Sequence, residues 1–320
     1  MSILKELIEH LDISFGDLAV NMVKAPTTYK VFQIPKRTGG MRVIEQPTQY
    51  VKNVQRGIIS VLFNQFETLD STMAYVKGRS IVDNANAHLG GKFILKMDFE
   101  NYFPSIKPID LSNFLSKHNV EIPKHELKFL VNYLFRKSSA GLHLSIGAPS
   151  SPMISNLVMY DIDTLIQNHC DSLSIIYTRY ADDLTFSSSS YEVLSELSAW
   201  IKDLLTRVDS PNLKLNERKT KIIGQGKSRR ITGVILTNDG GISVGRHSRK
   251  KIRAMIYQYK NNELNKSDIP YLHGFISHLR HIEPEHFKKL VNKFGEDIFV
   301  KLAKQSFFIG KSNKAKQIKK

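Results

Sequence analysis

Three aspartates stand where the chain could carry out metal-dependent chemistry. Asp182 and Asp183 are adjacent in a short segment between two apolar stretches, and Asp98 ends the apolar run 93–97. An adjacent Asp pair in a loop is most often a solvated turn, because Asp is a common turn residue. A carboxylate that ends a buried strand is costly unless it is paired or liganded. Carboxylates bind Mg²⁺, and two such ions can stabilise both the attacking and the leaving oxygen of a phosphoryl transfer. These residue types therefore predict metal-assisted phosphoryl transfer.

The charge of the chain indicates a polyanionic partner. Of 320 residues, 46 are Lys or Arg and 30 are Asp or Glu, for a net charge of +16, and residues 244–320 alone contribute +12. Such a field attracts nucleic acid and makes its binding salt-dependent. A solubilising basic surface is the alternative interpretation.

Composition also excludes several classes of protein. Cys170 is the only cysteine, which rules out an intrachain disulfide and a cysteine-based zinc site and favours a reducing compartment, the cytoplasm. No run of apolar residues is long enough to span a membrane, and the N-terminus lacks the apolar block of a signal peptide. We expect no membrane partner.

Apolar periodicity predicts the elements that must position these residues. Helices are expected over 3–11, 51–62, 81–88, 123–135, 152–166 and 194–205, and in the region from about 247 onward. Ser80 and Asp83 form a capping-box pattern, and Ser151 is the expected N-cap before Pro152. Strands are expected over 29–35, 41–45, 93–98, 174–180, 184–187, 213–215 and 221–223. Strands that alternate with helices and are followed by a basic helical tail predict an α+β body with a small α-helical appendage.

The acidic residues resemble motifs of the reverse transcriptases. Tyr180-Ala181-Asp182-Asp183 is similar to the YxDD motif of that family, and Asp98 with Phe103 five residues later resembles its first palm motif. The resemblance implies that the three aspartates ligate two Mg²⁺ ions. It also implies that Phe103 excludes the 2′-OH of ribonucleotides, although an isolated aromatic at this position would ordinarily be a core residue.

Other segments extend this resemblance. Gly147 opens a loop, Gly147-Ala148-Pro149-Ser150-Ser151-Pro152, that is similar to the second palm motif, which approaches the nucleotide. Ile146 stands where many relatives have glutamine, so a side-chain hydrogen bond to substrate is not expected there. Arg42 matches a position that grips the triphosphate, a contact that suits a guanidinium; Lys36 and Arg37 are weaker candidates. Lys219 resembles a lysine proposed as general acid to pyrophosphate, with an ordinary exposed lysine as the alternative.

Two elements resemble retron reverse transcriptases in particular. Residues 84–88, Asn-Ala-Asn-Ala-His, are similar to the family's NAxxH element, and 231–233, Ile-Thr-Gly, to its VTG element. Asn84 and His88 share a helix face on which they could contact RNA; His88 could equally be a structural histidine. The residues expected to bind RNA are Asn84, His88, Thr232, Gly233, Arg249, Lys250, Lys251 and Arg253.

The resemblance implies a right-hand polymerase. We expect fingers and palm within 1–243, with a core of about 20–243 and an antiparallel palm sheet, and a helical RNA-binding thumb at 244–320. The implied activity is synthesis of branched, multicopy single-stranded DNA from deoxynucleoside triphosphates. Its template is a cognate structured non-coding RNA and its primer is an internal 2′-OH. An anti-phage role with an effector protein is also implied.

Three other functions compete with this interpretation. An intron-type reverse transcriptase would need a maturation or endonuclease extension that these 320 residues do not supply. A catalytically silent RNA-binding scaffold would not be expected to retain all three carboxylates. A metal nuclease would leave both Phe103 and the Gly147 loop unexplained.

Overall fold

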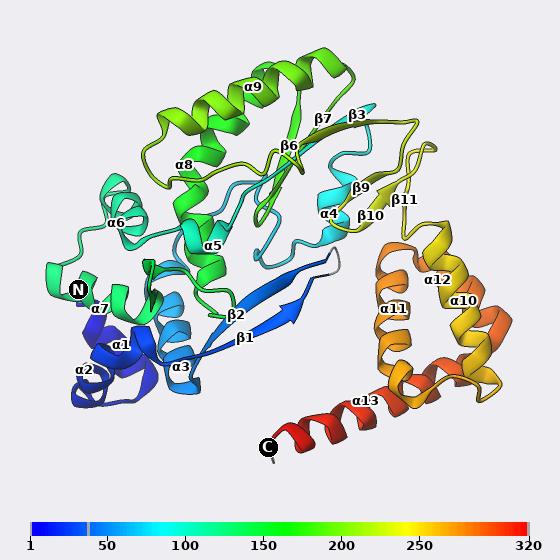
Figure 1. Ribbon diagram of the computed structural model, residues 1–320, viewed down its shortest axis with the longest axis horizontal. Coiled ribbons are helices and arrows are strands. Elements are labelled where there is room, and N and C mark those ends of the chain that lie inside the picture. The colour runs from blue at the N-terminus through cyan, green and yellow to red at the C-terminus, as the bar shows by residue number, and fades with distance from the viewer. Residues whose placement is uncertain (1, 37–38, 319–320) are drawn as a thin grey trace. The chain divides into compact units, whose positions relative to one another are not determined.

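The computed structural model describes residues 2–36 and 39–318, with side chains up to residue 311. The chain forms two compact units, Met1–Arg79 with Gly91–Ile222 and Ser80–Gly90 with Ile223–Lys320 (Figure 1). A short segment from the N-terminal half thus belongs to the second unit. The division expected at residue 243 separates a polymerase core from a thumb by function, and it stays a prediction.

A four-stranded sheet forms the centre of the first unit. Its order is β6–β7–β3–β8, and β3 and β6 each pair antiparallel with β7. Most residues of β3 and β7 are buried, so both strands lie in the interior. Helix α8 packs against β6, and α9 packs against β3 and β7. The bounds are β3 Phe93–Asp98, β6 Ile176–Tyr180, β7 Asp183–Ser188, β8 Lys221–Gly224, α8 Ser151–Ser172 and α9 Tyr191–Arg207.

The rest of the first unit is a long hairpin with helices around it. Strands β1 and β2 pair over seven residues each and project from the helices at their base (Figure 1). The bounds are α1 Ile3–Leu11, α2 Phe15–Lys24, η1 Ala25–Thr27, β1 Tyr29–Pro35, β2 Met41–Pro47, α3 Gln49–Ile58, the π-helix η2 Ile59–Phe63, α5 Tyr102–Ser105, α6 Pro108–Lys117, α7 Lys124–Leu134, β4 Arg136–Ser138 and β5 Gly141–His143.

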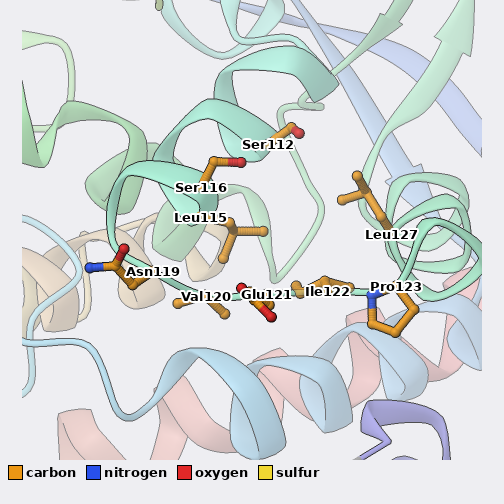
Figure 2. A pocket seen from close by; sticks show the side chains of 9 residues that line it. All are labelled: Ser112, Leu115, Ser116, Asn119, Val120, Glu121, Ile122, Pro123 and Leu127. Carbon is orange, nitrogen blue, oxygen red and sulfur yellow. The ribbon is translucent and has the colours of Figure 1, made fainter.

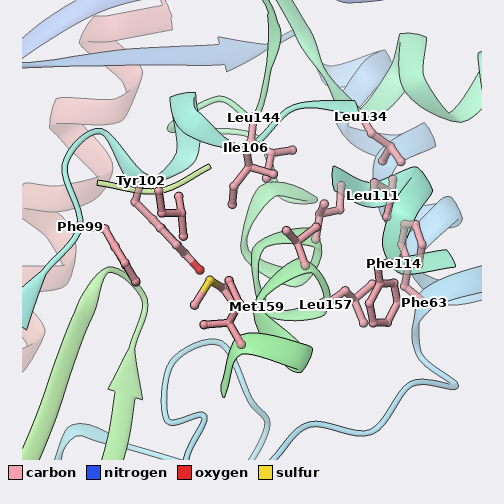
Figure 3. Packing of buried hydrophobic residues seen from close by; sticks show 14 of the residues in the cluster. Phe63, Phe99, Tyr102, Ile106, Leu111, Phe114, Leu134, Leu144, Leu157 and Met159 are labelled. Carbon is pink, nitrogen blue, oxygen red and sulfur yellow. The ribbon is translucent and has the colours of Figure 1, made fainter. Parts of the chain in front are cut away.

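One apolar core joins these elements. Figure 3 shows side chains from α5, α6, α7 and α8 meeting, with Phe99 and Tyr102 close to Met159 of α8. Helix α9 contributes Leu194 and Ile201, which are fully buried and lie on one face at helical spacing. The core therefore fixes the end of β3, and with it the position of Asp98.

The second unit combines a small sheet with helices. Helix α4 (Ile81–Asn86) packs against the sheet β9–β10–β11, and α10 to α13 pack on one another. The Ser80–Asp83 capping box that begins α4 is confirmed, because both reciprocal hydrogen bonds are present. The bounds are β9 Arg229–Ile231, β10 Val234–Leu236, β11 Ile242–Ser243, α10 Arg246–Lys260, η3 Lys266–Asp268, α11 Ile269–Ile282, α12 Pro284–Phe294 and α13 Glu296–Ile318.

Two local predictions were wrong. The segment 213–215 is not a strand; it makes only an isolated bridge, between Leu215 and Phe99. The N-cap of α8 is Ser150 rather than Ser151, and its side chain makes no capping bond. Its backbone is already helical, whereas a capping hydroxyl reaches back from an extended conformation. Among residues 2–36 and 39–318, no helix has the length and apolar character needed to cross a membrane.

Candidate active site

The structure brings the three predicted aspartates to one end of the central sheet. Asp98 is the last residue of β3 and lies directly opposite Asp183, the first residue of β7. Residues directly opposite in an antiparallel pair project to the same face. Asp182 occupies the β6–β7 turn, and its carbonyl accepts a hydrogen bond of 3.0 Å from the Phe99 amide. The buried β3–β7 pair therefore brings Asp98 to two acids that follow it by 84 and 85 positions in the sequence.

Mutual repulsion and burial perturb these acids. Burial raises the pKa of Asp182, and the negative charge of Asp98 adds to the rise. Burial also raises the pKa of Asp183 to about 6; Lys96 opposes the increase, while Asp182 and Asp98 add to it. Clustered carboxylates of this kind are typical of sites that bind a cation or carry out acid–base chemistry.

Lys219 lies at the same site. Its ammonium donates to both carboxylate oxygens of Asp98, at 2.7 and 2.8 Å. Burial lowers the pKa of Lys219, but the hydrogen bond and charge of Asp98 more than offset this, and the pKa is raised overall. The side chain of Lys219 is 59% exposed, so the cation can leave Asp98 without unfolding its surroundings. Its role as a general acid stays a prediction.

The donor set suits a hard cation but does not form a preassembled cage. Within the described part of the chain, no group of three or more His, Cys, Asp or Glu side chains is arranged to hold a metal ion. Mg²⁺ is commonly bound by one or two carboxylates together with substrate phosphates. The oxygen ligands of Asp98, Asp182 and Asp183 fit that mode of binding.

The predicted nucleotide contacts also lie in the first unit. Arg42 on β2 is exposed, and its positive charge lowers the pKa of Asp182. The Phe103 ring is half-buried between the rings of Tyr102 and Tyr75, with centroids 5.4 and 6.4 Å away. Lys36 is exposed just after β1. Arg37 lies outside the described residues. The roles proposed for these side chains stay predictions.

Gly147 packs against the backbone of β2. A Cβ atom at this position would lie 3.1 Å from the Glu45 carbonyl oxygen, and the Gly147 φ angle of +130° disfavours any other residue. The neighbouring Ile146 carbonyl accepts a 2.8 Å hydrogen bond from the Glu45 amide. The Glu45 carboxylate in turn contacts Arg136 and the His143 ring. The loop and the strand that carries Arg42 are therefore locked together.

Sequence reasoning missed the buried groups behind the acidic turn. Arg179 is fully buried and forms an ion pair with Asp163 of α8. The available signal was an arginine at the end of an apolar strand, directly before the Tyr180–Asp183 motif. Because a lone arginine is most often exposed, this residue type by itself does not indicate burial.

The two retron-like elements meet inside the second unit. Asn84 donates to the Thr232 hydroxyl at 3.4 Å, and both Thr232 and Gly233 have left-handed backbone conformations in the β9–β10 turn. Asn84 and His88 are fully buried. Burial does not suit direct contact with RNA through these side chains, so the geometry favours a structural role in holding the turn. Their part in RNA binding stays a prediction.

The burial of His88 predicts a pH-dependent stability. Burial lowers its pKa from 6.5 to about 3, so His88 stays neutral in the folded chain while it becomes charged in the unfolded chain. The free energy of unfolding should therefore fall as pH drops below 6.5. His88 should account for about 2 kcal/mol of the loss between pH 7 and 5. Urea unfolding should show that contribution missing in His88→Gln. Ile276→Val provides a destabilised control that adds no titratable group; equal pH profiles for His88→Gln and wild type would contradict the assignment.

The predicted basic contacts differ in availability. Lys250, Lys251 and Arg253 are exposed on α10. Arg249 donates from Nε to Glu283 at 2.6 Å, and Glu283 also accepts from the Val244 amide. Arg249 therefore stabilises the junction between β11 and α10, which leaves the three exposed cations as the stronger candidates for phosphate contacts.

A pocket elsewhere in the first unit is not part of this site. It lies beside α6 and the loop to α7, where Leu115, Asn119 and Leu127 are among its lining residues (Figure 2). None of the predicted site residues lines it. The position of this cavity therefore does not indicate the acidic cluster.

Comparisons with known proteins agree with this geometry. The family model described as "Reverse transcriptase (RNA-dependent DNA polymerase)" matches residues 34–236. The chain is 37% identical to the retron Ec83 reverse transcriptase of Escherichia coli, over 92% of this chain and 96% of that protein. It is 29% identical to the retron Ec73 reverse transcriptase of Escherichia coli, over 91% and 95%.

Among solved structures, the chain matches a telomerase from Candida tropicalis in complex with a fragment of telomeric RNA. The TM-score is 0.48 at 13% sequence identity, and the match covers 94% of this chain and 58% of that one. The match to the reverse transcriptase family and the similarity to retron enzymes along almost the whole chain both include the acidic cluster. The chain therefore belongs to the retron reverse transcriptases and is an RNA-directed DNA polymerase.

Proposed function

We propose that this enzyme copies a cognate structured non-coding RNA into branched, multicopy single-stranded DNA, primed by the 2′-OH of an internal guanosine. The observation that carries the proposal is the 37% identity to a retron enzyme along nearly the full length of both chains. The retron-like elements at 84–88 and 231–233 support it, because Asn84 of the first donates a hydrogen bond to Thr232 of the second. In a catalytically silent scaffold, three neighbouring carboxylates would repel one another without any function to offset that unfavourable energy.

The mechanism is attack of a hydroxyl on the α-phosphate of a deoxynucleoside triphosphate, with pyrophosphate as leaving group. Reverse transcriptases generally use divalent metal ions. Two Mg²⁺ ions held by Asp98, Asp182 and Asp183 would supply charge neutralisation and activation of the attacking hydroxyl. Catalysis of this kind depends mainly on positioning and electrostatics.

The side chains around the acidic cluster have distinct roles in this proposal. Arg42 binds the triphosphate through its guanidinium, and Lys36 adds positive charge beside it. Phe103 excludes the 2′-OH of ribonucleotides by steric contact. The Lys219 side chain first moves away from Asp98 and then donates its proton to the leaving pyrophosphate. Gly147 lets the backbone approach the incoming nucleotide closely.

The biological role that we propose is anti-phage defence together with an effector protein, in the cytoplasm. Its test is the plating efficiency of phage on cells that carry the intact locus. Protection should be lost when the locus carries Asp182→Asn. If protection survives this substitution, defence does not require DNA synthesis by this enzyme.

Nucleic acid that copurifies with the protein tests the proposed activity directly. A branched product should be shortened by DNase and by RNase separately, and cleavage of the 2′–5′ linkage by a debranching enzyme should release linear DNA. The Asp182→Asn protein should copurify with RNA alone. Plain RNA from the active protein would contradict branched DNA synthesis.

The exposed cations of α10 should control the salt dependence of RNA binding. Replacing Lys250, Lys251 and Arg253 with Gln should weaken binding and reduce the slope of log K against log salt by about 2 to 3, because each phosphate contact contributes about 0.7 to 0.9. The measurement is fluorescence anisotropy with the cognate RNA from about 50 to 300 mM salt, which spans Debye lengths above and below about 10 Å.

A control variant with the same charge change makes this result specific. Lys124, Lys128 and Lys137 are exposed lysines of the first unit, at α7 and β4. Their replacement with Gln removes the same three charges and should change the slope by less than about 1. An unchanged slope in the α10 variant would overturn the assignment of these residues.

A further inference from the structure

A buried ion pair lies directly behind the acidic turn. Arg179 at the end of β6 is fully buried, and its Nε donates to both oxygens of Asp163 at 2.9 Å while Nη2 donates to Oδ2 at 2.6 Å. Asp163 comes from α8 and is also fully buried. Two desolvated charges are costly unless geometry and additional hydrogen bonds satisfy them, so every further contact of this guanidinium matters.

The remaining nitrogen of Arg179 reaches the acidic turn. Nη1 donates to the Ala181 carbonyl at 3.2 Å, one residue before Asp182. Ala181 has a φ angle of +58°, a left-handed conformation that a residue with a side chain adopts only when its surroundings hold it. The backbone of Arg179 is itself fixed, because its amide donates to Ser71 at 2.7 Å and its carbonyl accepts from Met73 at 2.8 Å.

The same nitrogen also contacts Tyr102, the residue next to the Phe103 ring that is expected to contact the sugar. Nη1 donates to the Tyr102 hydroxyl at 3.3 Å, and the Tyr102 ring stacks on Phe99 with centroids 5.8 Å apart. Phe103 packs against that tyrosine ring. A third acceptor, Asn156 Oδ1 of α8, lies at 3.2 Å, so the two N–H groups of this nitrogen are shared among three acceptors.

We propose that Arg179, oriented by Asp163, is a positioning residue that sets both the Asp182 turn and the Phe103 ring, and thereby couples the rate of nucleotide addition to discrimination between deoxyribose and ribose. The discrimination part rests on the proposed role of Phe103. Arg179 touches neither substrate nor metal in this proposal; it acts through Ala181 on one side and through Tyr102 on the other.

Two tyrosines provide a matched test, because each places one hydroxyl on this ion pair. Tyr102 contacts Arg179 on the side of the active site, whereas the Tyr177 hydroxyl donates to Asp163 Oδ1 at 2.7 Å on the other side. The assay is single-nucleotide addition to a DNA primer annealed to an RNA template, with dNTP and rNTP compared. Tyr102→Phe removes the hydroxyl that accepts from Arg179 and donates to the Ser155 carbonyl at 3.3 Å, and it should lower dNTP-over-rNTP discrimination by about three- to tenfold. Tyr177→Phe should leave the ratio within about twofold.

A paired replacement separates positioning from folding. Arg179→Met with Asp163→Leu removes both buried charges, so the double variant should be more stable than either single variant, although the Tyr177 hydroxyl and the Ala181 carbonyl lose their partners. The Ala181 carbonyl nevertheless loses its donor, and the rate of dNTP addition should fall by at least about tenfold. A stable double variant with wild-type rate and discrimination would overturn the proposal. Should the double variant not fold, equal discrimination in Tyr102→Phe and Tyr177→Phe would overturn it.

Phe103→Ala keeps the proposed function and this inference distinguishable. Unchanged sugar discrimination in Phe103→Ala would refute the role proposed for that ring, while the rate measured for the double variant still tests the Asp182 turn. A change in Phe103→Ala without any change in Tyr102→Phe or the double variant would refute only the positioning role of Arg179.

Discussion

Replacing Asp182 with Asn is expected to reduce DNA synthesis by at least about 1,000-fold, which corresponds to a loss of about 4 kcal/mol of transition-state stabilisation. The amide keeps the shape of the side chain but removes the negative charge that a cation requires. Because burial and Asp98 already raise the pKa of Asp182, its charge is unfavourable in the folded chain, and the variant should be as stable as wild type or more so. Primer extension and thermal unfolding measure the two effects.

The interpretation of this variant depends on two comparisons. Binding of the cognate RNA should remain close to that of wild type, because the charge removed lies in the acidic cluster. Asp171→Asn is a matched control, since this aspartate is exposed at the end of α8. It should extend primers normally. Near wild-type extension by the Asp182 variant would refute the catalytic assignment.

Gly147→Val is expected to lower the efficiency of dNTP incorporation by about 10- to 100-fold. A side chain here meets two penalties: a φ angle of +130°, which costs of order 1–3 kcal/mol, and a Cβ placed 3.1 Å from the Glu45 carbonyl oxygen. The loop can relieve the contact only by moving away from β2, which would break the hydrogen bond between the Glu45 amide and the Ile146 carbonyl. Steady-state kinetics should show the loss mainly as a higher KM for dNTP.

Gly141 provides the control for backbone strain alone. It also has a left-handed φ angle, +87°, but a Cβ there would meet no atom within 4 Å. Gly141→Val should therefore lower thermal stability while leaving the KM for dNTP within about twofold, since a strained turn costs of order 1–3 kcal/mol wherever it lies. Equal kinetic effects from both substitutions would show that the contact with Glu45 is unimportant.

Elements with a clear apolar period could be predicted from the sequence. Strand β3 is confirmed as a short apolar run, the strands expected over 29–35 and 41–45 are confirmed as β1 and β2, and α9 is confirmed because its leucines and Ile201 recur at helical spacing. Short strands such as β4 and β11 were missed, since two or three residues contain no period. Helix α2 was also missed; Phe15, Val20 and Val23 are exposed on it, so its apolar residues do not mark a buried face.

The incorrect strand at 213–215 has a different cause. Leu213 is buried, as the alternating pattern suggested, but the segment exchanges only scattered bonds with the end of β3, such as the 2.8 Å bond from the Glu100 amide to the Lys214 carbonyl. Alternation reports which side chains are buried. It does not report whether a regular ladder of backbone hydrogen bonds forms.

The amino-acid sequence alone indicated the polymerase class and the three acids predicted to bind metal, because the resemblance to the family is carried by short motifs such as Tyr180–Asp183 that are visible without the fold. Only the tertiary structure decided that Asn84 and His88 are buried, that Gly147 packs against the Glu45 backbone, and that Arg179 donates to the Ala181 carbonyl in the turn before Asp182. Each of these depends on a partner far away in sequence, and no local pattern specifies which distant segment will cover a given side chain.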